Sequence, residues 1–250
     1  MSDAERNLLE ALRQMGPKPD DASKTSIKKG YSERLSAGLA QAFAADLRAR
    51  GLTNTRPSGP GEVGGSGAER RIAGGIGAKK VDVTFATEES GLILALSIKT
   101  INFADGKTKN YQKNLTNRRG DMLFESVTLH RRFPYAVLGG FFFFDEGASK
   151  DGNTKRLSTF ENAHQTLRLF TRRDAPAGRD EVFERLYIAL HHASPEAPSA
   201  QFFEAGKPDR PVELSSIFEE LIALIGERNF DMYVARNGRL KRRKVSSSQN

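Results

Sequence analysis

The chain has 250 residues, of which 38% are hydrophobic and 28% charged, a composition that predicts a soluble globular protein of one α/β domain with extensions or two small domains. It has no cysteine, which excludes disulfides and thiolate metal sites, and no apolar run approaches the ~20 residues that span a bilayer. The net charge of +8 favours polyanionic partners, nucleic acid before an anionic membrane.

The N-terminal 27 residues are predicted to form an extension and a linker. Leu8, Leu9 and Leu12 indicate a short amphipathic stretch, and the following GPKPDDASKTS is typical of a linker. The first residues, MSDAERNLLEALRQ, have neither the basic start nor the apolar core of a signal peptide. Together with the lack of cysteine, this favours a cytoplasmic protein without a membrane partner.

Residues 31–50 carry an apolar stripe with a spacing of four residues, which predicts a helix with one buried face that ends near Gly51. The stripe consists of Leu35, Leu39, Phe43 and Leu47. The next stretch, TRPSGPGEVGGSG, is too rich in glycine and proline for a packed element. It predicts a flexible loop that could move over a site.

Three strands are predicted after this loop. The first, Arg70–Ile76, has the weaker pattern, whereas Val81–Phe85 alternates cleanly and Leu92–Lys99 is richly apolar. The turn at Glu88–Gly91 is short enough to make the last two strands a hairpin.

A helix is predicted at Asn110–Arg132, with Leu123 and Val127 facing inward and Gly120 weakening the pattern. The remaining elements are a buried strand at Ala136–Phe144, a helix at Ser158–Arg173 that opens with the capping box Ser158-x-x-Glu161, a strand at Leu186–His191, a helix at Ser215–Arg228 and a basic C-terminal tail. The order from residue 31 is αβββαβ, an α/β arrangement whose first three strands form a meander. We expect one domain over residues 28–235, followed by the tail at 236–250.

The side chains of the predicted hairpin determine its register. Successive side chains alternate between the two faces of a strand, so the apolar sets of the two strands must lie opposite each other. The expected pairs are Val81 with Ile98, Val83 with Leu96, and Phe85 with Leu94. This register places Asp82 opposite Ser97, with Lys99 two residues further along on the same face.

A carboxylate, a hydroxyl and a lysine on one face are the groups that phosphodiester cleavage needs. Asp82 can hold Mg²⁺, or Mn²⁺ in its place, because hard cations prefer oxygen ligands. A bound metal polarises the phosphate and activates a water. Lys99 can orient that water or stabilise the charge that develops on the phosphate.

The stretch KKVDVTF…LALSIKTI resembles the motif of the PD-(D/E)XK nucleases, with Asp82 as the aspartate and Lys99 as the lysine. The resemblance covers roughly Tyr31 to Phe144. Val81 stands where the motif has proline, a minor change, and Ser97 stands where the second acid is expected.

The resemblance implies a restriction-endonuclease-like core, a mixed central sheet flanked by helices, with C-terminal additions. It implies a magnesium-dependent endonuclease that hydrolyses DNA in a bacterial restriction or phage-defence system. Cutting both strands symmetrically would need two sites, so the resemblance also implies a homodimer or a subunit of a defence complex.

The second acid must come from elsewhere, and some restriction endonucleases with a Ser-x-Lys motif take it from a nearby helix. The favoured residue is Glu125, with Asp121 next, because the two lie four residues apart on one face of the predicted helix. Glu33 and Glu69 are weaker candidates, at positions where the family often has an acid.

A run of basic residues beside the proposed site is expected to contact phosphates, with a solvated helix face as the alternative. It consists of Lys109, Lys113, Arg118, Arg119, Arg131 and Arg132. His191 and His192 could ligate a metal but lack a second ligand cluster at suitable spacing, and Phe141–Phe144 is more typical of a core strand than of a base-stacking platform.

Four other interpretations remain open from the sequence. Asp82 and Lys99 could be ordinary solvated strand residues, or Ser97 and Lys99 could form a nucleophilic dyad, although no oxyanion-hole motif accompanies them. Ser97 in place of the acid also suits a catalytically inactive nucleic-acid-binding subunit on the same fold. The last alternative is a protein-interaction module with a basic surface.

Overall fold

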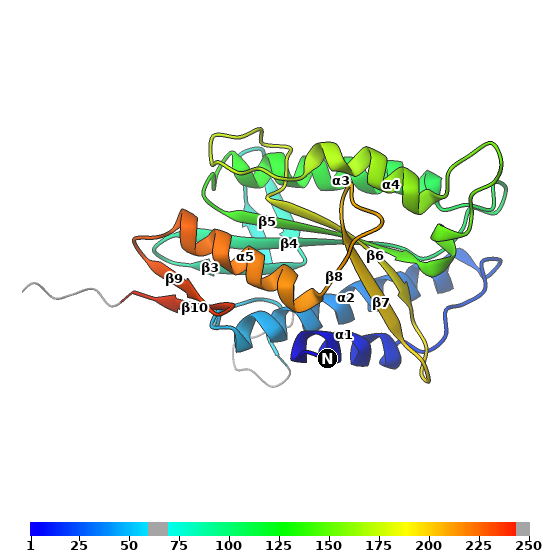
Figure 1. The fold of residues 1–250 in the computed structure, drawn as a ribbon, viewed down its shortest axis with the longest axis horizontal. Coiled ribbons are helices and arrows are strands. Elements are labelled where there is room, and N and C mark those ends of the chain that lie inside the picture. The colour runs from blue at the N-terminus through cyan, green and yellow to red at the C-terminus, as the bar shows by residue number, and fades with distance from the viewer. Residues whose placement is uncertain (60–69, 244–250) are drawn as a thin grey trace, which may run out of the picture.

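The computed structural model describes residues 1–59 and 70–243, which form a mixed α/β fold (Figure 1). The helices are α1 (Asp3–Gln14), α2 (Thr25–Ala49), α3 (Gln112–His130), α4 (Thr159–Leu167) and α5 (Leu214–Arg228). The strands are β1 (Arg70–Ala73), β2 (Ala78–Val81), β3 (Val83–Thr87), β4 (Gly91–Ile101), β5 (Val137–Asp145), β6 (Arg185–His192), β7 (Ser199–Glu204), β8 (Pro211–Val212), β9 (Tyr233–Arg236) and β10 (Arg239–Arg242).

The central sheet has six strands in the order β3-β4-β5-β6-β7-β8, and β4, β5 and β6 run parallel while the other neighbours are antiparallel. Helices α1, α2 and α5 cover one face, and α3 and α4 cover the other (Figure 1). Because β5 is buried on both faces, its side chains alternate between the two cores. Phe141 and Phe143 point to one core, Phe142 and Phe144 to the other, which confirms the prediction of a core strand.

The hairpin β3–β4 has the predicted register over part of its length. Val83 lies opposite Leu96 and Phe85 opposite Leu94, and these side chains pack under α2. The pairing of Val81 with Ile98 was wrong. Val81 instead pairs with Arg70 and packs in the core on the α3 side, because the chain bends at Asp82 between β2 and β3.

The predicted three-strand meander was therefore also wrong. Strands β1 and β2 form a separate two-stranded antiparallel sheet, and only β3 and β4 join the central sheet. The predicted mixed sheet flanked by helices is present, with six strands and a small hairpin beside it, but the specific αβββαβ core is not confirmed. Asp82 lies at the bend that separates the two sheets, where its side chain reaches β4.

Both ends of the chain contribute to the structure. Leu8 and Leu12, in the segment predicted as an extension, are buried where α1 packs against α2. The predicted basic tail begins with an ordered hairpin, β9–β10, in which Leu240 is buried. Residues 244–250 lie outside the described residues.

The helices lie where the sequence predicts them, but their ends and their buried residues differ from the prediction. The capping box of Ser158 and Glu161 is present at the start of α4, but that helix ends at Leu167 rather than near Arg173. In α3 the predicted inward residues Leu123 and Val127 are only half-buried. The residues of α3 that reach the core are Leu115, Met122 and Leu129, with the polar Glu125 and Ser126 buried between them.

The far end of α3 is held by buried charges. The Glu184 carboxylate lies 3.2 Å from the Nε2 atom of His130, the last residue of α3, and accepts a hydrogen bond of 2.6 Å from the Leu138 amide. Arg173 and Arg228 donate to the other carboxylate oxygen at 3.1 and 2.5 Å. Burial alone would raise the pKa of Glu184, but His130 and Arg228 hold it below its ordinary value.

None of the helices in the described part of the chain is long and apolar enough to cross a bilayer.

Candidate active site

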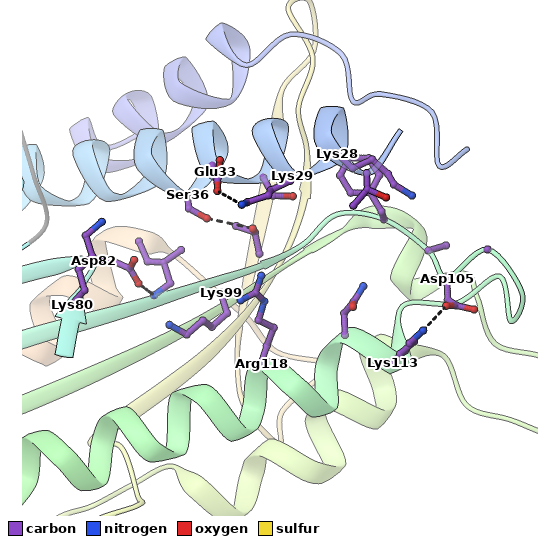
Figure 2. Close-up of a pocket in the computed structure, with 18 residues that line it drawn as sticks. Lys28, Lys29, Glu33, Ser36, Lys80, Asp82, Lys99, Asp105, Lys113 and Arg118 are labelled. Atoms are coloured by element: carbon purple, nitrogen blue, oxygen red, sulfur yellow. Dashed lines mark hydrogen bonds and ion pairs between the residues drawn. The ribbon is translucent and has the colours of Figure 1, made fainter. Parts of the chain in front are cut away.

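An open cleft of about 1060 Å³ lies between α2 and α3, where β2 passes into β3 and beside the second half of β4. Figure 2 shows that side chains from both helices and from the strands converge on it. We call it the central cleft. Its charged lining residues are Lys28, Lys29, Glu33, Lys80, Asp82, Lys99, Asp105, Lys113 and Arg118.

Asp82 occupies the bend between β2 and β3 and lines the central cleft (Figure 2). Its Oδ2 atom accepts a hydrogen bond of 2.6 Å from the backbone amide of Ile98 on β4. The carboxylate therefore takes the place of a strand partner for this amide, which accounts for the end of the β3–β4 ladder at Val83. The same bond fixes the carboxylate next to the second half of β4.

Ser97 and Lys99 point from β4 toward α3, as their shared parity predicts, and both contact Glu125. The Ser97 Oγ atom donates to Glu125 Oε2 at 3.2 Å, and the Lys99 Nζ atom donates to the same oxygen at 3.2 Å. The Glu125 side chain is 6% exposed and the Lys99 side chain 16% exposed. Glu125 is not among the residues that line the central cleft, and its carboxylate lies behind the lysine that does.

The charge state of Lys99 follows from its surroundings. Burial lowers the pKa of its ammonium group, but the carboxylates of Glu125 and Asp82 outweigh this effect, and the pKa lies above its ordinary value. Lys99 is therefore held in its charged form, with Glu125 as its direct partner. Arg118 opposes this shift, which shows that it also lies within electrostatic reach.

The other predicted acids are less close to this group. Asp121 lies one turn before Glu125, but its side chain is 64% exposed, pairs with Arg118 at 3.8 Å and does not line the central cleft. Glu33 lines the central cleft from α2, is 66% exposed and lies 3.7 Å from Lys29. Glu69 lies outside the described residues.

The predicted basic run divides into two groups. Lys113 and Arg118 line the central cleft from α3. The others do not line it, namely Lys109, Arg119, Arg131 and Arg132. The last two lie beyond the far end of α3, and at 1.5 Å per residue Arg131 is about 20 Å along the axis from Arg118. Only Lys113 and Arg118 of the predicted run therefore line the central cleft, and phosphate contact by this run stays a prediction.

Apart from Glu33, the sequence prediction missed the residues that α2 contributes to the central cleft. Lys28, Lys29 and Ser36 line the central cleft from this helix, and Ser36 Oγ lies 3.3 Å from Thr100 Oγ1 on β4. Lys80 at the end of β2 also lines it. Lys28, Ser32 and Ser36 recur every four residues, on a side of the helix different from the apolar stripe. This second stripe was the available signal.

The carboxylates of Asp82 and Glu125 suit a hard cation. Within residues 1–59 and 70–243, three or more histidine or acidic side chains do not gather into a ready-made metal cage. Mg²⁺ does not require one, because it is commonly held by one or two carboxylates while waters and a substrate phosphate complete its shell. His191 is fully buried, and burial lowers its pKa to about 4, so it is a neutral core residue.

Comparisons of the chain with protein families, with curated proteins and with solved structures find no match. The resemblance to the PD-(D/E)XK nucleases therefore rests on the residues of the sequence alone.

Proposed function

We propose that this protein is a magnesium-dependent endonuclease that hydrolyses phosphodiester bonds in DNA. The observation that carries the proposal is that Asp82 and Lys99 lie in an open cleft lined by further cations, with Glu125 bound to Lys99 behind the lining. Lys99 is a largely buried ionisable group whose pKa is shifted by its neighbours, and such a group in a cleft is typical of a catalytic site.

Each of the three groups has a chemical task in such a reaction. Asp82 and Glu125 would hold Mg²⁺, which when bound supplies a Lewis acid and a water of lowered pKa. Lys99 carries a positive charge at the same place, so it can orient a water or stabilise negative charge that develops on the phosphate. Asp82 keeps its position during these steps because the Ile98 amide binds it.

Glu125 supports the proposal because it can supply the carboxylate that the motif has at the position of Ser97. The expected second acid of the motif lies two residues before the lysine, on the same face of β4. In this chain that place holds a hydroxyl, which donates to Glu125 at 3.2 Å. A carboxylate from α3 thus lies next to the place where the strand lacks one.

The charge of the central cleft suits a polyanion. It is lined by six lysine or arginine side chains and three acidic ones. Lys28 and Lys29 lie on the α2 wall, and Lys113 and Arg118 lie on the α3 wall (Figure 2). A phosphate backbone passing between the helices would meet cations on both sides, and such contacts supply most non-specific affinity for nucleic acids.

We further propose, on the family resemblance, that the enzyme acts in a bacterial restriction or phage-defence system in the cytoplasm. A homodimer or a larger defence complex would supply the second active site that symmetric cutting of two strands needs.

The test is cleavage of supercoiled plasmid DNA by the purified protein in Mg²⁺ and, in parallel, in EDTA. We expect nicked and linear products only with the metal. Lys99→Ala should abolish them, whereas Lys150→Ala, an exposed lysine outside the central cleft, should leave them unchanged. Equal cleavage by the Lys99→Ala protein would contradict the proposal and point to a contaminating nuclease.

A second candidate is a catalytically inactive nucleic-acid-binding subunit on this fold. It is favoured by the contacts of Glu125, whose Oε2 atom is already engaged by both Ser97 and Lys99. This candidate predicts salt-dependent DNA binding without cleavage in Mg²⁺ or Mn²⁺. The plasmid assay and a binding titration together separate the two.

A further inference from the structure

The hairpin β9–β10 presents a basic face that does not belong to the central cleft. Pairing of Tyr233 with Arg242 and of Ala235 with Leu240 places these four side chains on one side, where Tyr233 and Leu240 are buried. Val234 lies opposite Lys241, and Arg236 opposite Arg239, so these four share the other side. All four are exposed. We call this side the hairpin face.

The three cations of the hairpin face have no counter-ions in the described residues. In the parts of the chain that the structure describes, Arg236, Arg239 and Lys241 form neither ion pairs nor side-chain hydrogen bonds. Arg242, by contrast, points to the other side and pairs with Glu89. Three unpaired cations on one small surface repel one another, a cost that a polyanionic ligand would remove.

The β9–β10 hairpin has a tight turn and packs against the rest of the fold. Asn237 and Gly238 have φ angles of +50° and +66°, the conformation of a tight two-residue turn. The Leu240 amide donates to the Arg50 carbonyl at 2.8 Å. A Cβ atom on Gly51 would lie 2.2 Å from the Leu240 carbonyl oxygen, so the hairpin packs directly on the end of α2. Figure 1 shows it at one end of the molecule, beside α5.

We propose that the hairpin face is a second DNA-binding surface, which contacts the phosphates of a duplex away from the central cleft. Arg239 and Lys241 are two residues apart on one strand, about 6.8 Å at 3.4 Å per residue, with Arg236 across from Arg239. A two-stranded ribbon with cations on one side can lie along a DNA groove. The inference rests on the proposed function only in naming DNA as the ligand.

Other partners fit the hairpin face less well. Protein interfaces have cores depleted in charge, and membrane-binding surfaces need apolar side chains that insert among the lipids. The hairpin face has one apolar side chain, Val234, against three cations. The feature nearby that would suit a membrane is Phe230, which is 68% exposed in the turn before β9.

The experiment is a DNA-binding titration over a range of salt concentrations with the variant Arg236→Ala/Arg239→Ala/Lys241→Ala. The probe is a 30-base-pair duplex of arbitrary sequence, in EDTA so that no cleavage occurs. The control Lys150→Ala/Lys155→Ala/Arg210→Ala removes the same three charges from exposed positions elsewhere. Thermal unfolding of both variants checks that each one folds.

We expect the slope of log K against log salt to become shallower by roughly 0.9 for each phosphate that the variant no longer neutralises, up to about 2.7 for the hairpin variant. The control should keep the wild-type slope. Equal slopes for all three proteins would overturn the proposal. So would a variant that keeps duplex binding but no longer binds vesicles of phosphatidylserine and phosphatidylcholine, which would identify the hairpin face as a membrane surface.

The outcome is separable from that of the nuclease proposal. If the hairpin variant loses salt-dependent binding while the wild-type protein never cuts plasmid DNA, the DNA-binding surface stands and the nuclease proposal fails. If the wild-type protein cuts and the hairpin variant binds like the control, the nuclease proposal stands and this one fails.

Discussion

Replacing Glu125 with glutamine tests whether this residue is the second acid of the proposed site. The change keeps the shape of the side chain but removes its charge. Ser97 and Lys99 each lie 3.2 Å from Glu125 Oε2, and the amide oxygen of glutamine can still accept both hydrogen bonds. Hydrogen bonds to charged groups stabilise a protein by ~1.5–3 kcal/mol and neutral ones by ~1 kcal/mol. We therefore expect a loss of roughly 1–2 kcal/mol in the free energy of unfolding.

The effect on cleavage should be much larger than the effect on stability. Glu125→Gln removes one of the two carboxylates that would hold Mg²⁺, and loss of one electrostatic element of an active site commonly lowers kcat by ~10²–10³-fold. The pKa of Lys99 should also fall, because the nearest charge that raises it is gone while its burial remains. The assays are single-turnover plasmid cleavage and denaturant unfolding.

Asp121→Asn is the matched control for this experiment. It changes the same chemistry four residues earlier on α3, at a side chain that is exposed and outside the central cleft. It should cut like the wild-type protein. Retained cleavage by Glu125→Gln would refute the assignment of the second acid, and loss of cleavage in Asp121→Asn alone would transfer that role to Asp121.

Asp82→Asn should lower cleavage by ~10²-fold or more. Its free energy of unfolding should stay close to the wild-type value, because the side-chain oxygen of asparagine can still accept the hydrogen bond from the Ile98 amide. Ser97→Glu should restore part of the cleavage that Glu125→Gln removes; no recovery in a folded double variant would argue against a shared metal site. Arg118→Ala should flatten the salt dependence of DNA binding by about one unit, whereas Arg131→Ala, outside the central cleft, should not. Burial lowers the pKa of His191 to about 4, against about 6.5 in the unfolded chain, so its protonation should destabilise the fold as the pH falls from 6.5 to 4, by up to about 3 kcal/mol. In His191→Asn, thermal unfolding should depend less on pH over this range. An unchanged pH dependence would contradict this prediction.

The strand part of the site could be predicted because alternation in a half-buried hairpin leaves few choices. Once Val83 and Phe85 must face Leu96 and Leu94, Ser97 and Lys99 necessarily point to the opposite side. The break at Asp82 could not be read from this pattern. A carboxylate that binds a backbone amide can end a strand ladder as effectively as a turn residue, and no periodicity records it.

For the site residues on helices, the sequence predicted the side of the helix but not the turn that faces the sheet. Spacing of four residues puts Asp121 and Glu125 on one side of α3, but it does not say which turn of the helix faces β4. The buried Met122 and Leu129 mark the covered stretch, and Asp121 lies at its exposed margin. The α2 wall was missed because the apolar stripe dominates the pattern of this helix, although the sheet leaves a polar side of the same helix facing the central cleft.

The two ends of the chain both hold α2 in place. Helix α1 packs along it, and the Leu240 amide near the C-terminus binds the Arg50 carbonyl just after it. One wall of the central cleft is therefore steadied by two segments that lie far apart in the sequence, α1 and the β9–β10 hairpin. A variant shortened to residue 230 would keep Asp82, Lys99 and Glu125 but lose the strand that binds the end of α2. We expect the central cleft to hold its shape only when both segments are in place.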